Sequence, residues 1–292
     1  MVSSRFHYIC VDEYQDSADI EAELIRLLSS AHGNLCVVGD VNQAVYGWRG
    51  SNHRLILDFH QQYPDAKVHT LDTNYRSGRS IVAAAEKLIS DNGGKANMSC
   101  KPARSDEGEV LYTRYASDAQ EAGAIAKIIQ DMVSRGEAKY CEVAVLARMH
   151  ALLRPVHKSL SRHNIPSASI QSPEDTETPE NAVQLMTIHQ SKGLEFKVVF
   201  LIGLEEGILP SKHSLFNADA LEEERRLCYV AMTRAIDSLY LSSCRTRSIN
   251  GTKRELEESR FIADIQGSLP VNKKIGDFRY DKIYRFIRSI CS

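Results

Sequence analysis

Residues 8–16 read YICVDEYQD, and they place two acids directly after a nearly continuous apolar run. The run from Phe6 to Val11 is rich in β-forming residues, which is typical of a strand covered on both faces of a parallel sheet. Asp12 and Glu13 should therefore stand where the strand leaves the sheet, at the carboxyl edge where open α/β sheets bind ligands. The alternative for this pair alone is two solvated loop acids or a cap for a helix over 18–30.

The rest of the chain predicts an α/β fold, because strand and helix patterns alternate along it. The expected strands are 6–11, 35–38, 67–71, 110–115, 142–147, 183–187, 197–202 and 238–242. The expected helices are 18–30, 53–63, 79–91, 119–134, 152–162 and 221–235. The polar, acidic segment 167–181 is typical of a surface loop, and we expect a domain boundary near 71–77.

Composition limits the class of protein without indicating a partner. The 292 residues are 43% hydrophobic and 25% charged, with a formal net charge of -2, so any nucleic-acid binding must come from local residues. The seven cysteines show no zinc-site spacing, which favours a reducing, cytoplasmic setting. No apolar run approaches the ~20 residues that cross a bilayer, so we expect no membrane association.

A second apolar run closes on a polar loop at 37–51, VVGDVNQAVYGWRGS. Two adjacent strand ends that carry acids and a glutamine indicate a site. Taken singly, the glycines fit ordinary turns and Trp48 fits a core aromatic. However, Trp48 lies between Gly47 and Arg49, a sequence setting that favours a flat ring presented to a base.

Three further stretches follow: LDTNYRS (71–77), LMTIHQSKGLEFKVVFLIGLEEGILP (185–210) and LEEERRLCYVAMTRA (221–235). In this order, the five stretches closely resemble the motor motifs of the UvrD/Rep/PcrA family of superfamily 1A DNA helicases. The resemblance covers about 6–243. It implies a RecA-like P-loop NTPase fold of parallel sheets with flanking helices.

The resemblance implies a site for ATP and Mg²⁺. Asp12 would be the metal residue, holding Mg²⁺ through its water shell, and Glu13 would orient or deprotonate the attacking water. Gln43 matches the glutamine that senses the γ-phosphate and links it to the DNA side. Arg234 matches the arginine finger, whose planar donor fork suits the charge of the transition state.

Three more residues of the motifs would contact the nucleotide. By the same resemblance, Tyr75 would stack on the adenine and Arg76 would contact the γ-phosphate from across the cleft. Glu195 matches the acid that accepts a hydrogen bond from the ribose.

Four residues would face single-stranded DNA. Trp48 resembles the aromatic that stacks on a base, a contact that tolerates any sequence. Arg49 and His189 fall where the family contacts or supports the DNA backbone, although a satisfied loop histidine is the alternative for His189. His150 stands where many relatives have an asparagine that touches DNA, and it is the candidate for that contact.

The chain departs from the family pattern in two places. No stretch matches the GxxxxGK[ST] phosphate loop, so we expect 1–70 to be the second half of RecA-like domain 1A. The large 2B insertion is also missing, which makes 71–250 a RecA-like domain 2A without it, followed by a C-terminal helical tail over 251–292. These departures suggest a fragment, a split gene product or a degenerate subunit.

The family resemblance implies ATP-driven 3' to 5' translocation on single-stranded DNA, or DNA unwinding. We expect this chain alone to be inactive without the phosphate-loop half, which would be its partner. The alternative is a non-catalytic module that binds DNA or protein and works with a helicase or nuclease subunit.

Overall fold

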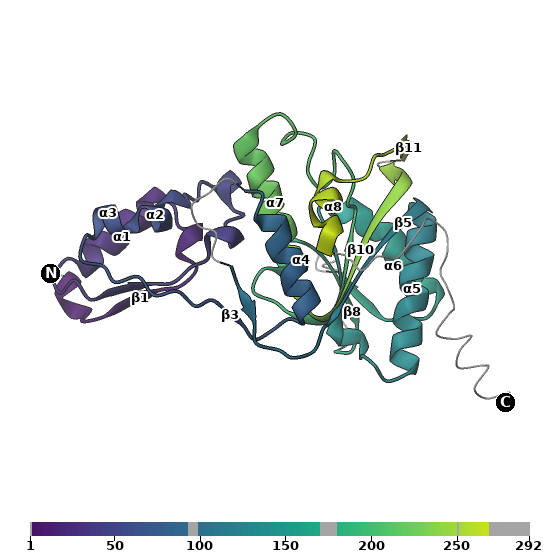
Figure 1. Cartoon of the computed structure of the whole chain (residues 1–292), viewed down its shortest axis with the longest axis horizontal. Coiled ribbons are helices and arrows are strands. Elements are labelled where there is room, and N and C mark those ends of the chain that lie inside the picture. Colours follow the sequence, from purple (N-terminus) through teal and green to yellow (C-terminus); the bar gives the residue numbers. More distant parts are fainter. Residues whose placement is uncertain (1, 93–98, 170–179, 250, 269–292) are drawn as a thin grey trace.

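In the computed structural model, two α/β parts lie side by side along the chain. The structure describes residues 2–92, 99–169, 180–249 and 251–268. The smaller part, up to about residue 63, holds β1, β2 and helices α1 to α3, and the larger part holds a broad sheet with helices on both faces (Figure 1). The α/β class and the RecA-like architecture predicted from the sequence are confirmed.

The larger part is built on a seven-stranded sheet in the order β11-β10-β9-β6-β8-β7, with β5 also paired to β10. All of these pairs are parallel except β10 with β11. The strands are β5 (Glu109–Ser117), β6 (Val143–Ala147), β7 (Ser167–Ser169), β8 (Val183–Thr187), β9 (Phe196–Ile202), β10 (Ala235–Ile249) and β11 (Thr252–Glu255).

Two hydrophobic cores form because alternate residues of the central strands point to opposite faces. Ala144 and Leu146 of β6 join one core, whereas Val143 and Val145 join the other. The first core lies under α4 (Arg79–Ile89), α7 (Ala218–Met232) and α8 (Arg260–Ile265), and the second lies under α5 (Asp118–Ser134) and α6 (Leu153–Arg162) (Figure 1). The sheet is therefore covered on both faces.

The N-terminal part has a much smaller core. Its strands β1 (Ile9–Val11) and β2 (Leu35–Val37) form a parallel pair of their own, packed near α1 (Asp19–Ser29), α2 (Arg54–Leu57) and α3 (Phe59–Gln62). The prediction that the run 6–11 is covered on both faces is wrong, because Phe6, Tyr8 and Cys10 are exposed. With only two strands and one side of helices, this sheet lacks the neighbours that normally bury a parallel strand.

Four secondary-structure predictions also need correction. Residues 67–71 form no strand, and a two-stranded pair of β3 (Thr73–Asn74) with β4 (Lys101–Pro102) follows instead. The helix expected over 53–63 is interrupted at Asp58. The expected loop 167–181 begins with strand β7, and its residues 170–179 lie outside the described residues.

The last correction concerns the segment 251–292, which was predicted to be helical. Residues 252–255 form strand β11, and only α8 is an α-helix within the described part, up to residue 268. Phe261, Ile262 and Ile265 of α8 are buried in the core beside α4. These residues extend the larger part rather than trail from it.

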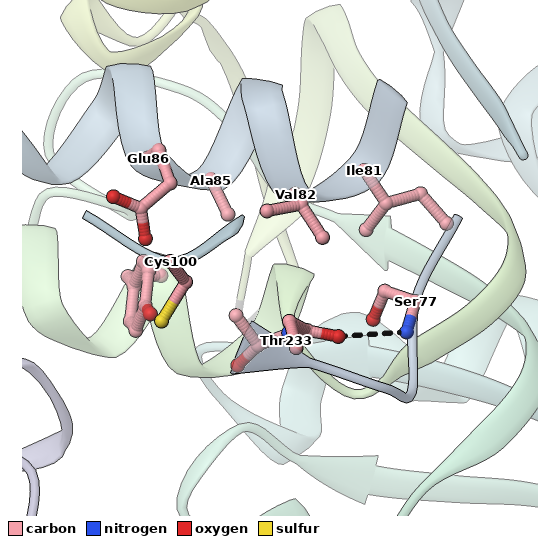
Figure 2. A pocket seen from close by; sticks show the side chains of 9 residues that line it. Ser77, Ile81, Val82, Ala85, Glu86, Cys100 and Thr233 are labelled. Atoms are coloured by element: carbon pink, nitrogen blue, oxygen red, sulfur yellow. Dashed lines mark hydrogen bonds between the residues drawn. The ribbon is translucent and has the colours of Figure 1, made fainter. Parts of the chain in front are cut away.

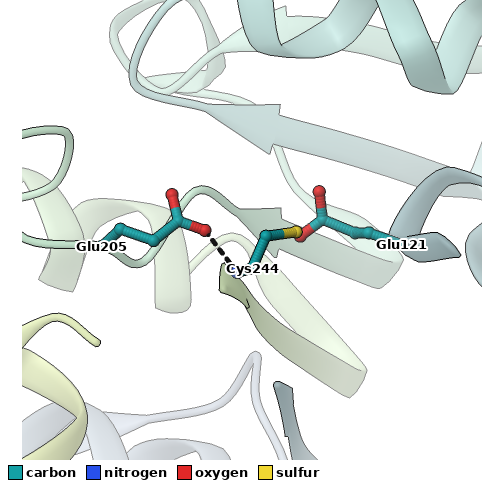
Figure 3. Close-up of side chains that lie close together, drawn as sticks. All are labelled: Glu121, Glu205 and Cys244. Atoms are coloured by element: carbon teal, nitrogen blue, oxygen red, sulfur yellow. Dashed lines mark hydrogen bonds between the residues drawn. The ribbon is translucent and has the colours of Figure 1, made fainter. Parts of the chain in front are cut away.

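A buried polar cluster ties the edge of the larger part together. Arg247 is 1% exposed and lies between the carboxylates of Glu121 and Glu205, at 2.8 and 2.7 Å. Glu205 also accepts a hydrogen bond of 2.6 Å from the backbone N–H of Cys244 (Figure 3). The three acidic or thiol groups lie within metal-binding distance of one another, but the Arg247 guanidinium already satisfies both carboxylates. The cluster is structural.

Candidate nucleotide and DNA site

The two predicted acids stand in the turn that follows β1. The Glu13 backbone N–H donates to Asp12 Oδ1 at 2.8 Å, and Glu13 adopts a left-handed conformation with φ 54°. This conformation is rare outside glycine, asparagine and aspartate, and it turns the chain directly into the short 3-10 helix Tyr14–Asp16. Asp12 and Glu13 directly follow β1, which ends at Val11 and pairs in parallel with β2, so the expected position at the carboxyl end of a parallel strand is confirmed. Both residues are exposed.

Lys192 lies next to the same acids, although it comes from the other part of the chain. Its Nζ forms an ion pair with Asp16 and lies 3.2 Å from Glu13 Oε2 and 3.0 Å from the Gln43 carbonyl oxygen. Burial raises the pKa of Asp16, and its second oxygen, Oδ1, has no hydrogen-bond partner. Sequence reasoning assigned no role to Lys192 or Asp16.

Arg234 connects the two parts from the end of α7. Its side chain is held by the Val230 and Leu194 carbonyls, at 3.0 and 3.1 Å, and it reaches Gln43 Oε1 at 3.4 Å. Arg234 is only 2% exposed, and burial together with the nearby Arg76 lowers the pKa of its guanidinium to about 10. Two cationic groups are therefore gathered at one junction.

The loop before α4 fixes Arg76. Asn74 Oδ1 accepts hydrogen bonds from the backbone N–H groups of Arg76 and Ser77, both at 3.0 Å, and Ser77 Oγ donates to the Ala235 carbonyl at 2.6 Å. Arg76 also donates to the Thr233 carbonyl at 3.3 Å. Ser77 and Thr233 both line a small pocket beside α4, so this loop and the end of α7 form one wall (Figure 2).

The remaining nucleotide-side candidates lie at the edge of this junction. Glu195 Oε2 accepts from Arg76 Nε at 2.6 Å, so the two residues expected to bind different parts of a nucleotide are bonded to each other. The Tyr75 ring is 76% exposed, which leaves its faces open for stacking. Both side chains of the Arg76–Glu195 pair are partly solvated, and such pairs contribute only about 0–1 kcal/mol. The pair can therefore open at little cost.

The donor set fits the cofactors that the motifs imply. Asp12 and Glu13 offer exposed carboxylate oxygens, the ligand type that Mg²⁺ prefers. Arg76 and Arg234 supply the donor forks that suit phosphate oxygens. Bound Mg²⁺ and ATP would supply the reactive phosphoryl group and the charge that these residues neutralise.

A second cluster, of aromatic and basic residues, lies beside the first. Trp48 is 65% exposed, and its ring meets His189 edge to face at 6.2 Å between centroids. The Arg49 guanidinium lies 4.7 Å from the Trp48 ring centre and 5.2 Å from that of Tyr46. Trp48 therefore lies on the surface, where His189 and Arg49 pack against its ring, and the alternative of a core tryptophan is wrong.

The histidines of this region differ in their surroundings. Burial, Arg148 and Arg49 lower the pKa of His189 to about 4, so the ring is neutral near pH 7. His150 follows β6 at the start of a short 3-10 helix, and burial alone lowers its pKa. Ring and cation–π contacts bring Trp48, Arg49 and His189 together, and within the described residues no hydrogen bond or ring contact links His150 to them.

The broad parallel sheet flanked by helices defines the larger part as a RecA-like α/β domain. Residues 69–174 and 167–246 match the family model of the UvrD-like helicase C-terminal domain, and residues 1–64 match that of the UvrD/REP helicase N-terminal domain. The chain therefore belongs to the UvrD-like helicase family.

Its relatives include proteins named ATP-dependent DNA helicase PcrA. The protein from Leuconostoc citreum is 26% identical over 432 residues, and the match covers 91% of this chain and 58% of that protein. The protein from Bacillus subtilis strain 168 is 26% identical over 435 residues, covering 92% and 59%. This chain thus spans about three fifths of the length of these curated relatives, and because the aligned spans exceed its 292 residues, the relatives carry extra residues within them.

A solved structure is also similar: the C-terminal domain of a possible DNA helicase from Lactobacillus plantarum WCFS1. Its TM-score is 0.43 at 19% identity, and the match covers 68% of this chain and 99% of that chain. Among the residues that the structure describes, none of the helices has the length and apolar character needed to span a bilayer.

Proposed function

We propose that this chain is the DNA-facing and arginine-bearing portion of an ATP-driven motor that moves 3' to 5' along single-stranded DNA. The observation that carries this proposal is the contact between Arg234 and Gln43, because it joins the two parts of the chain at a cluster of phosphate-type donors. The exposed Trp48 follows Gln43 by only five residues, so a nucleotide group and a DNA group lie on one short segment. ATP and DNA as substrates favour a cytoplasmic location.

In this proposal, each nucleotide-side residue acts on one part of the ATP. Asp12 would hold Mg²⁺ through water, and Glu13 would orient the attacking water from the adjacent position. Arg76 and Arg234 would donate to the γ-phosphate oxygens, where the developing charge of the transition state is largest. Gln43 would report the γ-phosphate to the DNA side through its backbone neighbours.

The adenosine end would use the two residues at the edge of the junction. Tyr75 would stack on the adenine, and Glu195 would accept from the ribose after releasing Arg76. This exchange of partners would leave Arg76 unpaired only when phosphate oxygens are present to receive it, which links phosphate binding to ribose binding.

On the DNA side, Trp48 would stack on a base. Arg49 and His189, which contact the Trp48 ring, would also contact the DNA backbone. Stacking of a base on an aromatic ring contributes roughly 1–3 kcal/mol and does not depend on base identity. His150 would extend the contact to the DNA backbone.

The exposed surface of the N-terminal part supports a further polypeptide segment as partner. Apolar residues before β1, on α1 and directly after β2 are exposed there: Phe6, Tyr8, Ile20, Leu24, Leu27 and Val38. A parallel sheet is normally buried on both faces, so this surface suits a segment that adds strands. We propose that this segment carries a GxxxxGK[ST] phosphate loop, in the same polypeptide or in a separate one.

DNA-stimulated ATP hydrolysis tests the proposal directly. The chain alone should show only background turnover, and a phosphate-loop polypeptide from a relative should restore turnover when added. Glu13→Gln in the restored enzyme is the matched control, because it keeps the shape of the side chain and removes its charge. Robust turnover by the chain alone that Glu13→Gln abolishes would show that no partner is needed.

A non-catalytic module that binds DNA, or a helicase or nuclease subunit, is the second candidate. Lys192 favours it, because this buried ammonium group already neutralises the acids beside the site. If the mixture binds single-stranded DNA yet never hydrolyses ATP, this second candidate replaces the motor.

A further inference from the structure

The loop that presents Trp48 is tied to helix α7. We define the Trp48 loop as residues 44–50. Arg226 Nε donates to the Ala44 carbonyl at 3.0 Å, at the start of the loop, and the Gly47 backbone N–H donates to Glu223 Oε1 at 3.1 Å, directly before the tryptophan. Two side chains of one helix therefore hold two points of the loop.

Glu223 and Arg226 are suited to this task by their spacing. Residues three apart lie on the same face of a helix, so both side chains reach the loop together. Arg226 is itself buried and is steadied by Glu222, whose carboxylate lies 3.7 Å away at the i,i+4 position.

Gly47 gives the contact its close fit. A Cβ atom at this position would lie 2.7 Å from Glu223 Oε2, nearer than side chains approach one another. The carboxylate thus occupies the space that any larger residue would fill. The glycine before Trp48 has a reason beyond turn formation, because it lets the helix bind the loop backbone directly.

The other end of α7 reaches the nucleotide side. The helix is buried from Glu224 to Met232, and Arg234 follows two residues after its end. Met232 stands nine positions after Glu223 in the helix, a rise of about 14 Å at 1.5 Å per residue. A buried helix moves as a unit, so a shift at one end changes the position of the other.

We infer that Glu223 and Arg226 are positioning residues that hold the Trp48 loop on α7, so that this helix joins the base-stacking ring to Arg234. The inference rests on the proposed function for the role of Trp48 and Arg234. The contact between Glu223 and the loop stands independently, as a property of the protein without DNA or nucleotide.

Trp48 is the only tryptophan of the chain, so its fluorescence reports on the loop. Time-resolved anisotropy of the 292-residue protein without DNA should show a larger fast component in Glu223→Ala than in the unaltered protein. In Glu223→Gln the Trp48 ring should move as slowly as in the unaltered protein, because the amide oxygen can still accept a hydrogen bond from the Gly47 N–H. Asp219→Ala is the matched control, since it removes an exposed acid from the first turn of the same helix.

DNA affinity provides the second measurement, with a labelled oligothymidine as the probe. Glu223→Ala should bind roughly three- to tenfold more weakly, the scale of one typical hydrogen bond, while the melting temperature stays nearly constant. Gly47→Ala should reproduce both effects by displacing the carboxylate, and it should add little in the Glu223→Ala background.

The outcomes separate this inference from the proposed function. Equal ring mobility in Glu223→Ala and the unaltered protein would overturn the inference, as would equal impairment in Glu223→Ala and Glu223→Gln. If the unaltered protein fails to bind oligothymidine, the DNA-side function is wrong, while the anisotropy comparison still decides whether Glu223 holds the loop.

Discussion

Replacement of Trp48 by alanine separates a DNA-binding ring from a structural one. About one third of the Trp48 residue is hidden, and its ring contacts His189 and the Arg49 guanidinium. Truncation of a fully buried tryptophan costs about 3–5 kcal/mol, so the hidden third accounts for about 1–1.7 kcal/mol of unfolding free energy. For a chain of this size, that corresponds to a fall of about 5 °C or less in melting temperature.

Trp48→Ala should affect DNA affinity more clearly than it affects stability. A stacked base contributes roughly 1–3 kcal/mol, so Trp48→Ala should weaken oligothymidine binding by about five- to 150-fold. The measurement is fluorescence anisotropy of labelled oligothymidine and oligodeoxyadenosine, with circular dichroism melting in parallel. Trp48→Phe is the matched control, since it retains a stacking ring and should recover most of the affinity.

The reasoning would be refuted by a large fall in melting temperature with unchanged oligonucleotide affinity. It would equally be refuted if the loss were confined to one of the two oligonucleotides, because stacking on a bare ring does not read the base.

Three further predictions address the other clusters. In an enzyme completed with a phosphate-loop polypeptide, Arg234→Ala should lower kcat by about 10³ with little change in nucleotide affinity, and a loss within tenfold would argue against an arginine finger. Because the pKa of His189 is lowered to about 4, the unfolded chain takes up a proton below about pH 6.5 that the folded chain does not. Unfolding free energy should therefore fall between pH 6.5 and pH 4, by at most about 1.4 kcal/mol per pH unit before solvent screening, and urea titrations should show a shallower fall for His189→Gln. Arg247→Ala should lower the unfolding free energy by about 3–5 kcal/mol in urea titrations, because it leaves two buried carboxylates unpaired, whereas the exposed neighbour Arg245→Ala should change little.

Most elements of the larger part were predictable because they follow a simple apolar or periodic pattern. The strand over 183–187 has the predicted bounds, and the strand over 197–202 begins only one residue earlier, because short, mainly apolar runs suit a buried parallel strand. Strands β7 and β11 were missed because SAS and TKRE carry no apolar run. They are held by backbone pairing to β8 and β10, which a single sequence does not reveal.

The sequence predicted which residues belong to the site, but it did not predict which of them contact one another. Arg234 and Gln43 meet as parts of one junction, but their pairing joins residues 191 apart, and no local pattern encodes it. Lys192 stands in the stretch 185–210, in which the sequence indicated roles for His189 and Glu195 only. Its role depends on Asp16, which becomes a partner only when the two parts of the chain pack together.

The left-handed backbone at Glu13 has a consequence for how such a protein can change. This conformation costs an ordinary residue about 1–2 kcal/mol relative to glycine, and the fold tolerates that cost at the one turn where an acid follows Asp12. Selection for thermal resistance alone would favour glycine there, and selection for turnover would retain the carboxylate. The residue found at position 13 in a descendant chain would therefore indicate whether selection had favoured stability or turnover.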